Sequence, residues 1–431
     1  MKSRISAGSS ELLNRIKPKS EFGRNILTLM SGATVAQAIP IAISPILTRL
    51  YTPEDFGVFA LFIALLSVFG SVASGRYEQA LLLPKKEEDA INLMALGFII
   101  TLLLSTFLLL ILLLLHDTIV SLLNNTHIGA WLYFLPLAIL FTGLFNVLSY
   151  FNNRKKHYAD LRNAAIAKSF AGAVVQIAVG WIKSGAAGLI IGQMASLLAA
   201  NAKLLKNTLA DSTFFDRLSR VRIIALAKKY RDFPKFQGPH AILNSFSSQM
   251  PIYFFSAFFT SGVVGFFALS IRIVFLPLSI ISSSAAKVFN EKAARSLGGQ
   301  ENLHFLTRNV LTSTVKKTLL PFAVIVLFAP DIFAFVFGTP WREAGVYTQI
   351  LSPWLYMVFV VSMVAYIPNL YNQQKRALKL EIIYTLLRLI SLATGIIFHS
   401  VYIAIALFSL SGFVMLAYNL GWMLSLTKGE H

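Results

Sequence analysis

The chain of 431 residues has no cysteine and only 19 acidic residues. The lack of cysteine excludes disulfides, thiolate metal sites and cysteine nucleophiles. Charged residues make up 13% of the chain and hydrophobic residues 56%, with a mean hydropathy of +0.67, which excludes an ordinary soluble protein. The sequence also lacks a Walker loop, a glycine-rich phosphate loop, a nucleophile elbow and any metal-ligand spacing. We therefore expect neither an enzyme nor a cofactor or metal.

Long apolar segments dominate the chain instead. Twelve of them are each close to the ~20 residues that a helix needs to cross the hydrocarbon layer. They cover residues 26–48, 57–75, 91–114, 130–150, 163–182, 185–203, 238–258, 262–283, 317–336, 346–368, 379–397 and 401–424. This pattern predicts an all-α integral membrane protein with twelve transmembrane helices.

The basic residues show how the segments are oriented. Alternate connections, starting with the N-terminal segment, hold 32 of the 38 Lys and Arg residues, whereas the opposite set holds only Arg49, Lys183 and Arg342. Positive charge collects on the cytoplasmic side of membrane proteins, so both termini are predicted to be cytoplasmic. The net charge of +19 then reflects topology and attraction to membrane lipids, and nucleic acid is not an expected partner.

A repeat divides the chain into two halves. At an offset of 208 residues, the stretch around Gly57 is copied around Gly265, and five further positions match. The matching pairs are Thr52 and Thr260, Phe59 and Phe267, Ala60 and Ala268, Leu61 and Leu269, and Ile63 and Ile271. Both halves start inside with six segments, so they are predicted to be parallel repeats related by an axis along the membrane normal.

The predicted organisation follows from this repeat. A basic cytoplasmic N-terminus (1–25) precedes an N-lobe (26–203), and a basic cytoplasmic linker (204–237) precedes a C-lobe (238–424) and a short cytoplasmic tail (425–431). Apolar residues at helical spacing in the linker predict an amphipathic helix on the inner leaflet. Two further features occur in both halves. Prolines are expected to kink helices beside a cavity; they are Pro40, Pro45, Pro136, Pro251 and Pro353. An Asp at an external helix end, Asp117 or Asp331, is expected to be a helix cap.

Three basic residues lie within the apolar segments. Arg272 and Arg388 are each about nine or ten residues from a segment end, near the bilayer centre at 1.5 Å per residue. A cation at that depth costs at least ~2.5–3.5 kcal/mol, so we expect both to line a central cavity and bind an anionic group such as phosphate. The alternative is structural pairing, with Glu381 or with carbonyls at helix ends. Lys168 is a third candidate, and its alternative is snorkelling to the inner surface.

Two further groups of polar residues are candidates. Gln37 and Gln249 lie in the proline-containing first segment of each half and are predicted to line the cavity, with helix–helix hydrogen bonds as the alternative. Arg49 is predicted to lie at a membrane interface or gate. Arg76 and Glu78 are predicted to lie at the inner surface, either as an anchor with a local ion pair or as a gate or lipid-headgroup contact.

Several motifs carry a family resemblance. Residues 48–60 (TRLYTPEDFGVFA), 75–84 (GRYEQALLLP), 337–345 (FGTPWREAG) and 351–354 (LSPW) resemble the polysaccharide-transporter branch of the multidrug/oligosaccharidyl-lipid/polysaccharide (MOP) exporter superfamily. The first motif is fairly specific for this branch, whose members include the Wzx-type flippases of bacterial surface polysaccharides. The resemblance covers essentially the whole chain.

The resemblance implies a V-shaped pair of six-helix lobes around a cationic lumen. It further implies transfer of an undecaprenyl-diphosphate-linked oligosaccharide, such as an O-antigen or capsule unit, from the cytoplasmic to the periplasmic leaflet of the bacterial inner membrane. Arg272 and Arg388 are the candidates for the diphosphate. A polysaccharide polymerase and a chain-length regulator are further candidate partners. The alternatives are a cation-coupled exporter of the same superfamily, or a membrane polymerase or glycosyltransferase.

Overall fold

The computed structural model describes residues 21–182, 185–208, 215–296 and 302–428, and in these ranges it contains helices, turns and loops but no strand. Eleven of the described helices are long and apolar enough to cross a membrane. These observations confirm the prediction of an all-α membrane protein. The N-terminal segment 1–20 and the tail beyond 428 lie outside the described residues.

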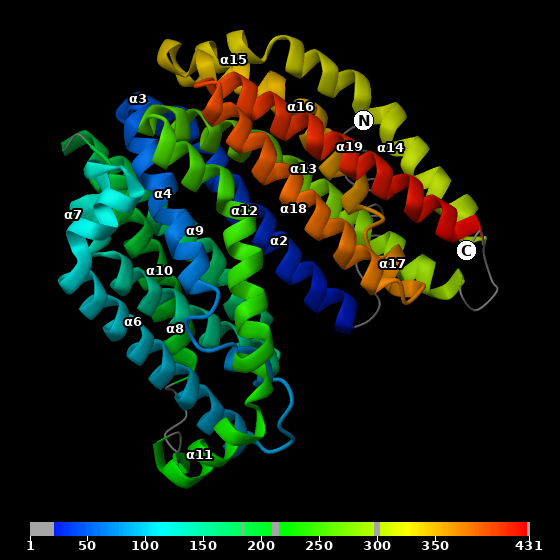
Figure 1. Cartoon of the computed structure of the whole chain (residues 1–431). Helices are drawn as coiled ribbons and strands as arrows, with labels where there is room; N and C mark the ends of the chain where they lie inside the picture. The colour runs from blue at the N-terminus through cyan, green and yellow to red at the C-terminus, as the bar shows by residue number, and fades with distance from the viewer. Residues whose placement is uncertain (1–20, 183–184, 209–214, 297–301, 429–431) are drawn as a thin grey trace, which may run out of the picture.

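The helices follow one another in two sets of similar length. The first half holds α2 (Glu21–Ala42), α3 (Ser44–Leu50), α4 (Pro53–Gly70), α5 (Tyr77–Ala80), α6 (Glu87–Leu123), α7 (Gly129–Leu132), α8 (Leu135–Arg154), α9 (Tyr158–Ile182) and α10 (Ala187–Thr208), and α11 (Arg220–Lys229) follows in the linker. The second half holds α12 (Gly238–Phe258), α13 (Ser261–Ser296), α14 (Leu303–Leu327), α15 (Ala329–Phe337), α16 (Arg342–Ser362), α17 (Ile367–Leu370), α18 (Gln374–Ile397) and α19 (Val401–Lys428). Figure 1 shows most helices of the two halves as two arms that meet at one end and diverge toward the other, whereas α12 of the second half runs beside α4.

The helices differ from the predicted spans at two places in particular. The segment predicted as span seven forms a helix, α12, but it is not among the eleven apolar ones, because serines and amides interrupt its hydrophobic residues. Residues 284–316, expected to be a loop, are largely helical, since α13 extends to Ser296 and α14 begins at Leu303. Basic side chains made this stretch look like a connection, yet long basic residues are good helix formers.

The two repeated Asp residues are not side-chain caps. Asp331 lies in the first turn of α15, whose N-cap Phe328 makes no side-chain hydrogen bond, and Asp117 lies inside α6, just after a kink at Leu115 (φ −122°, ψ 21°). Each Asp therefore follows a break in a helix. A carboxylate in that position is stabilised by the partial positive charge at the N-terminus of the next helix. Among the described residues, it does not accept a hydrogen bond from the free amides there.

The contact between the lobes is built by the repeated glycines. A Cβ atom at Gly57 on α4 would overlap the backbone carbonyl of Ser261, and a Cβ at Gly265 on α13 would overlap that of Pro53. Ser261 and Pro53 are themselves 208 residues apart, as are the two glycines. The contact is therefore reciprocal about a pseudo-twofold axis. Only glycine lets the two backbones approach this closely.

Helix caps repeat beside the glycines. The Thr52 hydroxyl accepts from the Asp55 amide at 3.2 Å and the Asp55 carboxylate accepts from the Thr52 amide at 3.0 Å, which forms a capping box with Pro53 at the first helical position. In the second half the Thr260 hydroxyl accepts from the Val263 amide at 3.4 Å, the equivalent position.

Aromatic contacts extend the same junction. The Trp341 indole donates to the Thr48 carbonyl at 2.9 Å and its ring packs edge-on against Phe56 with centroids 4.9 Å apart. The Tyr51 hydroxyl donates to the Gln176 carbonyl at 2.6 Å, and burial, with a smaller effect of Asp55, raises the pKa of Tyr51 to about 12. The junction joins the N-terminal ends of α4 and α13, which the charge distribution predicts to be external.

The predicted topology can be tested directly because the chain has no cysteine. Thr126→Cys, in an exposed connection after α6, is expected to react in intact cells with a membrane-impermeant maleimide. Asp232→Cys, exposed after α11, is expected to react only after permeabilisation. Labelling of the Asp232→Cys variant in intact cells would overturn the orientation.

The glycine contact makes a second prediction. Gly57→Ala adds a methyl group where backbone is already present, so it is expected to lower the thermal denaturation midpoint in detergent, although Ala usually favours a helix by about 1 kcal/mol over Gly. Gly421→Ala is the matched control, because a Cβ there meets nothing within 4 Å. Equal or higher midpoints for both variants would show that the lobes do not depend on this contact.

Candidate functional site

A cavity of about 280 Å³ lies at the junction of the lobes and brings together residues far apart in the sequence. Its lining comes from α2, α4, α9 and α10 of the first half and from Arg272 on α13 of the second. The lining residues are Pro40, Ile43, Phe59, Ile63, Lys168, Ser169, Gly172, Ala173, Gln176, Gly192, Gln193, Ser196 and Arg272. Two of the three intramembrane cations therefore line one cavity, and no acidic residue is among its lining residues.

A break in the first helix forms one wall of this cavity. Pro40 has no amide hydrogen, and the carbonyl that it leaves free, Ala36, accepts instead from the Ser169 hydroxyl on α9 at 2.7 Å. Helix α2 ends at Ala42 and α3 begins at Ser44, where Pro45 follows. The Pro40 carbonyl in turn accepts from the Ser44 hydroxyl at 2.6 Å and from Arg272 Nη2 at 3.4 Å.

Both alternatives that the sequence left open for Arg272 occur together. The guanidinium reaches a carbonyl at the end of α2, and the same side chain lines the cavity. A 3.4 Å contact is at the long end for a hydrogen bond, and it engages one of the five guanidinium N–H groups. Donor capacity is thus left for an anion.

Lys168 has an aromatic neighbour. Its ammonium lies over the Phe145 ring, 4.6 Å from the centroid, while the side chain lines the cavity. A cation–π contact stabilises a desolvated ammonium by about 2 kcal/mol. Close packing of α9 on α10 narrows this side of the cavity, since a Cβ at Gly192 would overlap Gln176.

The other predicted cavity residues lie elsewhere. The Arg388 guanidinium stacks on the Tyr384 ring, 3.7 Å from the centroid, and no ion pair with Glu381 is found in the part of the chain that the structure describes. Arg388, Gln37 and Gln249 are not among the residues that line this cavity or the second one below. Both glutamines are half-buried.

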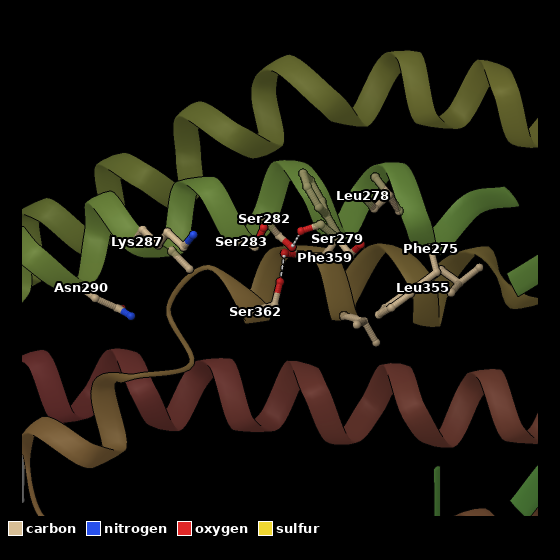
Figure 2. Close-up of a pocket in the computed structure, with 12 residues that line it drawn as sticks. Phe275, Leu278, Ser279, Ser282, Ser283, Lys287, Asn290, Leu355, Phe359 and Ser362 are labelled. Atoms are coloured by element: carbon tan, nitrogen blue, oxygen red, sulfur yellow. Dashed lines mark hydrogen bonds between the residues drawn. The ribbon is translucent and has the colours of Figure 1, made fainter. Parts of the chain in front are cut away.

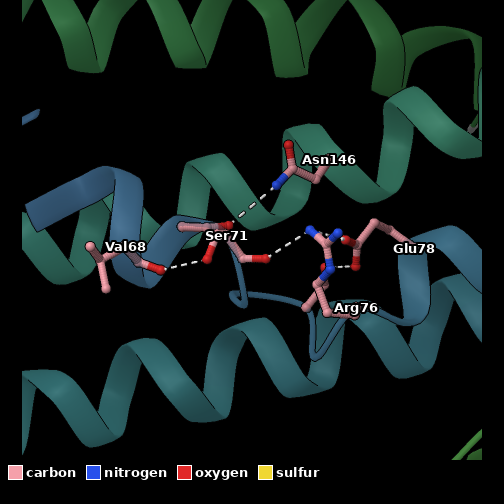
Figure 3. A network of polar contacts seen from close by, with 7 residues as sticks. Val68, Ser71, Arg76, Glu78 and Asn146 are labelled. Atoms are coloured by element: carbon pink, nitrogen blue, oxygen red, sulfur yellow. Dashed lines mark hydrogen bonds and ion pairs between the residues drawn. The ribbon is translucent and has the colours of Figure 1, made fainter. Parts of the chain in front are cut away.

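The expected interface residues form two unlike arrangements. Arg49 is exposed in the last turn of α3 and donates to the Pro45 carbonyl at 3.4 Å, a favourable place for a cation at a helix C-terminus. Arg76, in contrast, has a left-handed backbone (φ 63°) and donates to the Ser71 carbonyl at 3.1 Å, just beyond the end of α4. Figure 3 shows this network, in which Asn146 also donates to the Gly70 carbonyl at 3.4 Å. The free carbonyls at the end of α4 are thereby satisfied.

Glu78 completes the network. It is 3% exposed, accepts from the Ser74 hydroxyl at 2.5 Å and lies 3.6 Å from the Arg76 guanidinium. Ser74 packs beside Gly97, ten residues along α6 from its charged start at Glu87. Ten helical residues correspond to about 15 Å, so the network lies about 15 Å along α6 from that charged start. Helix α4 ends at Gly70, before span two was expected to end.

A second cavity was not predicted from the sequence. It has a volume of about 400 Å³ and lies between α13 and α16 of the C-lobe. Figure 2 shows Ser279, Ser282 and Ser362 between the two helices, with Lys287 and Asn290 toward one end and Phe275 toward the other. The signal available in the sequence was the serine-rich run 279–284 inside an apolar segment.

Comparison with known protein families identifies the family of this chain. Residues 46–346 match the model of a family described as polysaccharide biosynthesis protein. The chain belongs to this family. The matched range includes the contact between the lobes at Gly57 and Gly265, and it includes Lys168 and Arg272. A comparison with curated protein sequences gave no match.

Several solved membrane transporters share the fold of this chain. The lipid II flippase MurJ in an inward closed conformation has a TM-score of 0.69 at 12% identity, with coverage of 94% of this chain and 90% of that one. A MOP superfamily transporter from Pyrococcus furiosus gives 0.60 at 14% identity, covering 94% and 96%. An inward-facing multidrug resistance transporter of the MATE family gives 0.58 at 15% identity, covering 93% and 94%. The polysaccharide-family chain therefore has the MOP transporter fold, as the resemblance implied.

The buried Arg76–Glu78 pair makes a testable prediction about stability. Glu78→Ala leaves a largely buried guanidinium without its counter-charge and is expected to cost about 3 kcal/mol, a clear drop in the thermal denaturation midpoint. Glu88→Ala is the control, because Glu88 and its partner Arg222 are both about half exposed and such exposed pairs contribute little to stability. Equal shifts in the two midpoints would contradict a structural role for Glu78.

Proposed function

We propose that this protein is a flippase for a lipid-linked oligosaccharide. The substrate is an undecaprenyl-diphosphate-linked unit of a surface polysaccharide, such as an O-antigen or capsule unit, that moves from the cytoplasmic to the periplasmic leaflet of the bacterial inner membrane. The observation that carries the proposal is the cavity between the lobes, which holds Lys168 and Arg272 and has no acidic lining residue. The polysaccharide biosynthesis family and the fold shared with MurJ support it.

The chemistry of the cavity suits a diphosphate. Arg donates several N–H groups in a planar fork that matches phosphate oxygens, and Lys adds a point charge. Gln176 and Gln193 line the same space and supply neutral amides. In an apolar surrounding such charge-assisted hydrogen bonds are stronger than in water. An uncharged lipid headgroup would leave both cations without a counter-charge.

The arrangement of the lobes indicates how transport proceeds. The lobes are joined at the end that is predicted to be external and diverge toward the cytoplasmic end, so the described conformation suits loading from inside. A phosphate oxygen bound by Arg272 would replace its long contact with the Pro40 carbonyl. Substrate binding would thereby release a tie between α13 and the broken helix α2. Opening of the glycine junction would then expose the cavity outside, as alternating access requires.

A cation-coupled exporter is the second candidate, because MATE transporters share the fold. Such a transporter needs a buried carboxylate that binds the coupling ion. Within the described residues Glu78 is the fully buried carboxylate, yet it is paired with Arg76 and is not among the residues that line either cavity. The cationic lining favours the anionic lipid substrate.

The translocated unit would pass to a polysaccharide polymerase and its chain-length regulator.

The site makes a prediction for cells. Arg272→Ala is expected to abolish surface polysaccharide and to raise the cytoplasmic-leaflet pool of undecaprenyl-diphosphate-linked oligosaccharide, because the anion loses its main donor. Lys168→Gln is expected to reduce surface polysaccharide less, since one of two cations remains. Both are measured by glycan gels and mass spectrometry of extracted lipids, with protein levels checked by immunoblot.

The matched control is Arg388→Gln, a mid-membrane arginine that stacks on Tyr384 and does not line this cavity. It is expected to retain surface polysaccharide. Normal glycan levels in Arg272→Ala cells with normal protein levels would show that the cavity does not bind the substrate.

A further inference from the structure

The second cavity, between α13 and α16, adjoins the cationic cavity along one helix. Phe275 lines the second cavity and lies one turn from Arg272, which lines the first. At 100° per residue, Ser279, Ser283 and Asn290 fall within about 20° of Arg272 around the axis of α13. One stripe of α13 therefore connects the cationic cavity with a polar pocket nearer the C-terminal end of the helix.

The serines of this pocket present acceptors rather than donors. The hydroxyls of Ser279, Ser283 and Ser362 donate to carbonyls of Leu276, Ile280 and Phe359 in their own helices, at 2.8, 3.1 and 2.8 Å. A serine hydroxyl has one donor and two lone pairs, so the lone pairs remain for a ligand.

Asn290 adds an acceptor without a partner. Its Oδ1 atom is buried and makes no hydrogen bond within the described part of the chain. A buried polar atom of this kind costs about 1–3 kcal/mol unless a ligand or water satisfies it. The donors of the pocket are the Asn290 amide group and the Lys287 ammonium at the same end.

This set of groups discriminates between ligands. A phosphate or carboxylate offers only acceptors and would face the lone pairs of the serines. A neutral sugar offers hydroxyl groups that donate to those lone pairs and accept from Lys287 and Asn290, while Phe275, 39% exposed, offers an apolar face for ring carbons. The volume of about 400 Å³ is within the range of ligand sites.

We propose that the pocket between α13 and α16 binds the hydroxyl groups of the first, uncharged sugar of the substrate while Lys168 and Arg272 hold the diphosphate. This assignment rests on the proposed function, since the order of the two cavities along α13 then matches the order of diphosphate and sugar in the lipid-linked unit. It makes the pocket the part of the protein that selects a glycosylated over a bare lipid diphosphate.

The test measures the binding of two probes to the full-length protein in detergent. The probes are farnesyl diphosphate and farnesyl diphosphate carrying one N-acetylglucosamine, and the readout is the ratio of their dissociation constants by thermophoresis. We expect the wild-type protein to bind the glycosylated probe about tenfold more tightly, the contribution of one or two neutral hydrogen bonds. A ratio near one in the wild type would overturn the proposal.

Variants locate the preference and separate the two sites. Ser279→Ala combined with Asn290→Leu is expected to bring the ratio near one and to leave the dissociation constant of farnesyl diphosphate unchanged. Ser284→Ala is the matched control, because Ser284 also donates to Ile280, at 2.9 Å, but does not line the pocket. A tenfold ratio that persists in the double variant, or is lost in the control, would overturn the proposal that this pocket binds the sugar.

Arg272→Gln distinguishes the failure of the two proposals. It is expected to raise both dissociation constants by a similar factor and to keep the ratio. If it changes neither constant while the double variant still removes the ratio, the diphosphate site is wrong and the sugar pocket stands. Free N-acetylglucosamine as a third probe shows whether the pocket binds sugar without the lipid diphosphate. If free N-acetylglucosamine competes with the glycosylated probe, and the double variant abolishes this competition, the result supports the pocket.

Discussion

The reciprocal contact of Gly57 and Gly265 is the constraint on which the rest of the structure depends. Each glycine lets its helix lie against the backbone of the other lobe, at Ser261 and Pro53. Because the two contacts are related by the repeat, any side chain at either position would separate the lobes at their joined end. Arg272 lies seven residues beyond Gly265, two turns along the same helix, so this junction also sets where Arg272 meets the N-lobe.

In the cavity, the mid-membrane cation Arg272 and the broken helix α2 stabilise each other. Pro40 leaves a carbonyl for Ser169, and its own carbonyl accepts from Arg272. The broken backbone supplies partial negative charge where a mid-membrane cation would otherwise be unsatisfied. The cation in turn stabilises the helix end. A phosphate that binds Arg272 would therefore act on a site that is coupled to the shape of α2.

Part of the candidate site could be predicted from the sequence. Depth and charge selected Arg272 and Lys168 as cavity residues, because a cation far inside an apolar segment needs a cavity or a partner. The same criteria selected Arg388, which stacks on Tyr384 and shares neither cavity described. Depth along a helix is encoded locally, whereas the direction of a side chain around that helix depends on which neighbours pack against it. The serine pocket was missed because serines also satisfy carbonyls of their own helix.

The sequence by itself determined the all-α membrane class, the two similar halves and the glycine-bearing turn that repeats between them. These features rest on hydropathy and on the offset of 208 residues, which can be read along the chain because they are local or periodic. Only the tertiary structure decided that Lys168 and Arg272 share one cavity and that Glu78, beside Arg76, is buried beyond the end of α4. The reason is physical: these pairings arise where separate helices meet, and helix contacts depend on shape over the whole lobe rather than on any one segment.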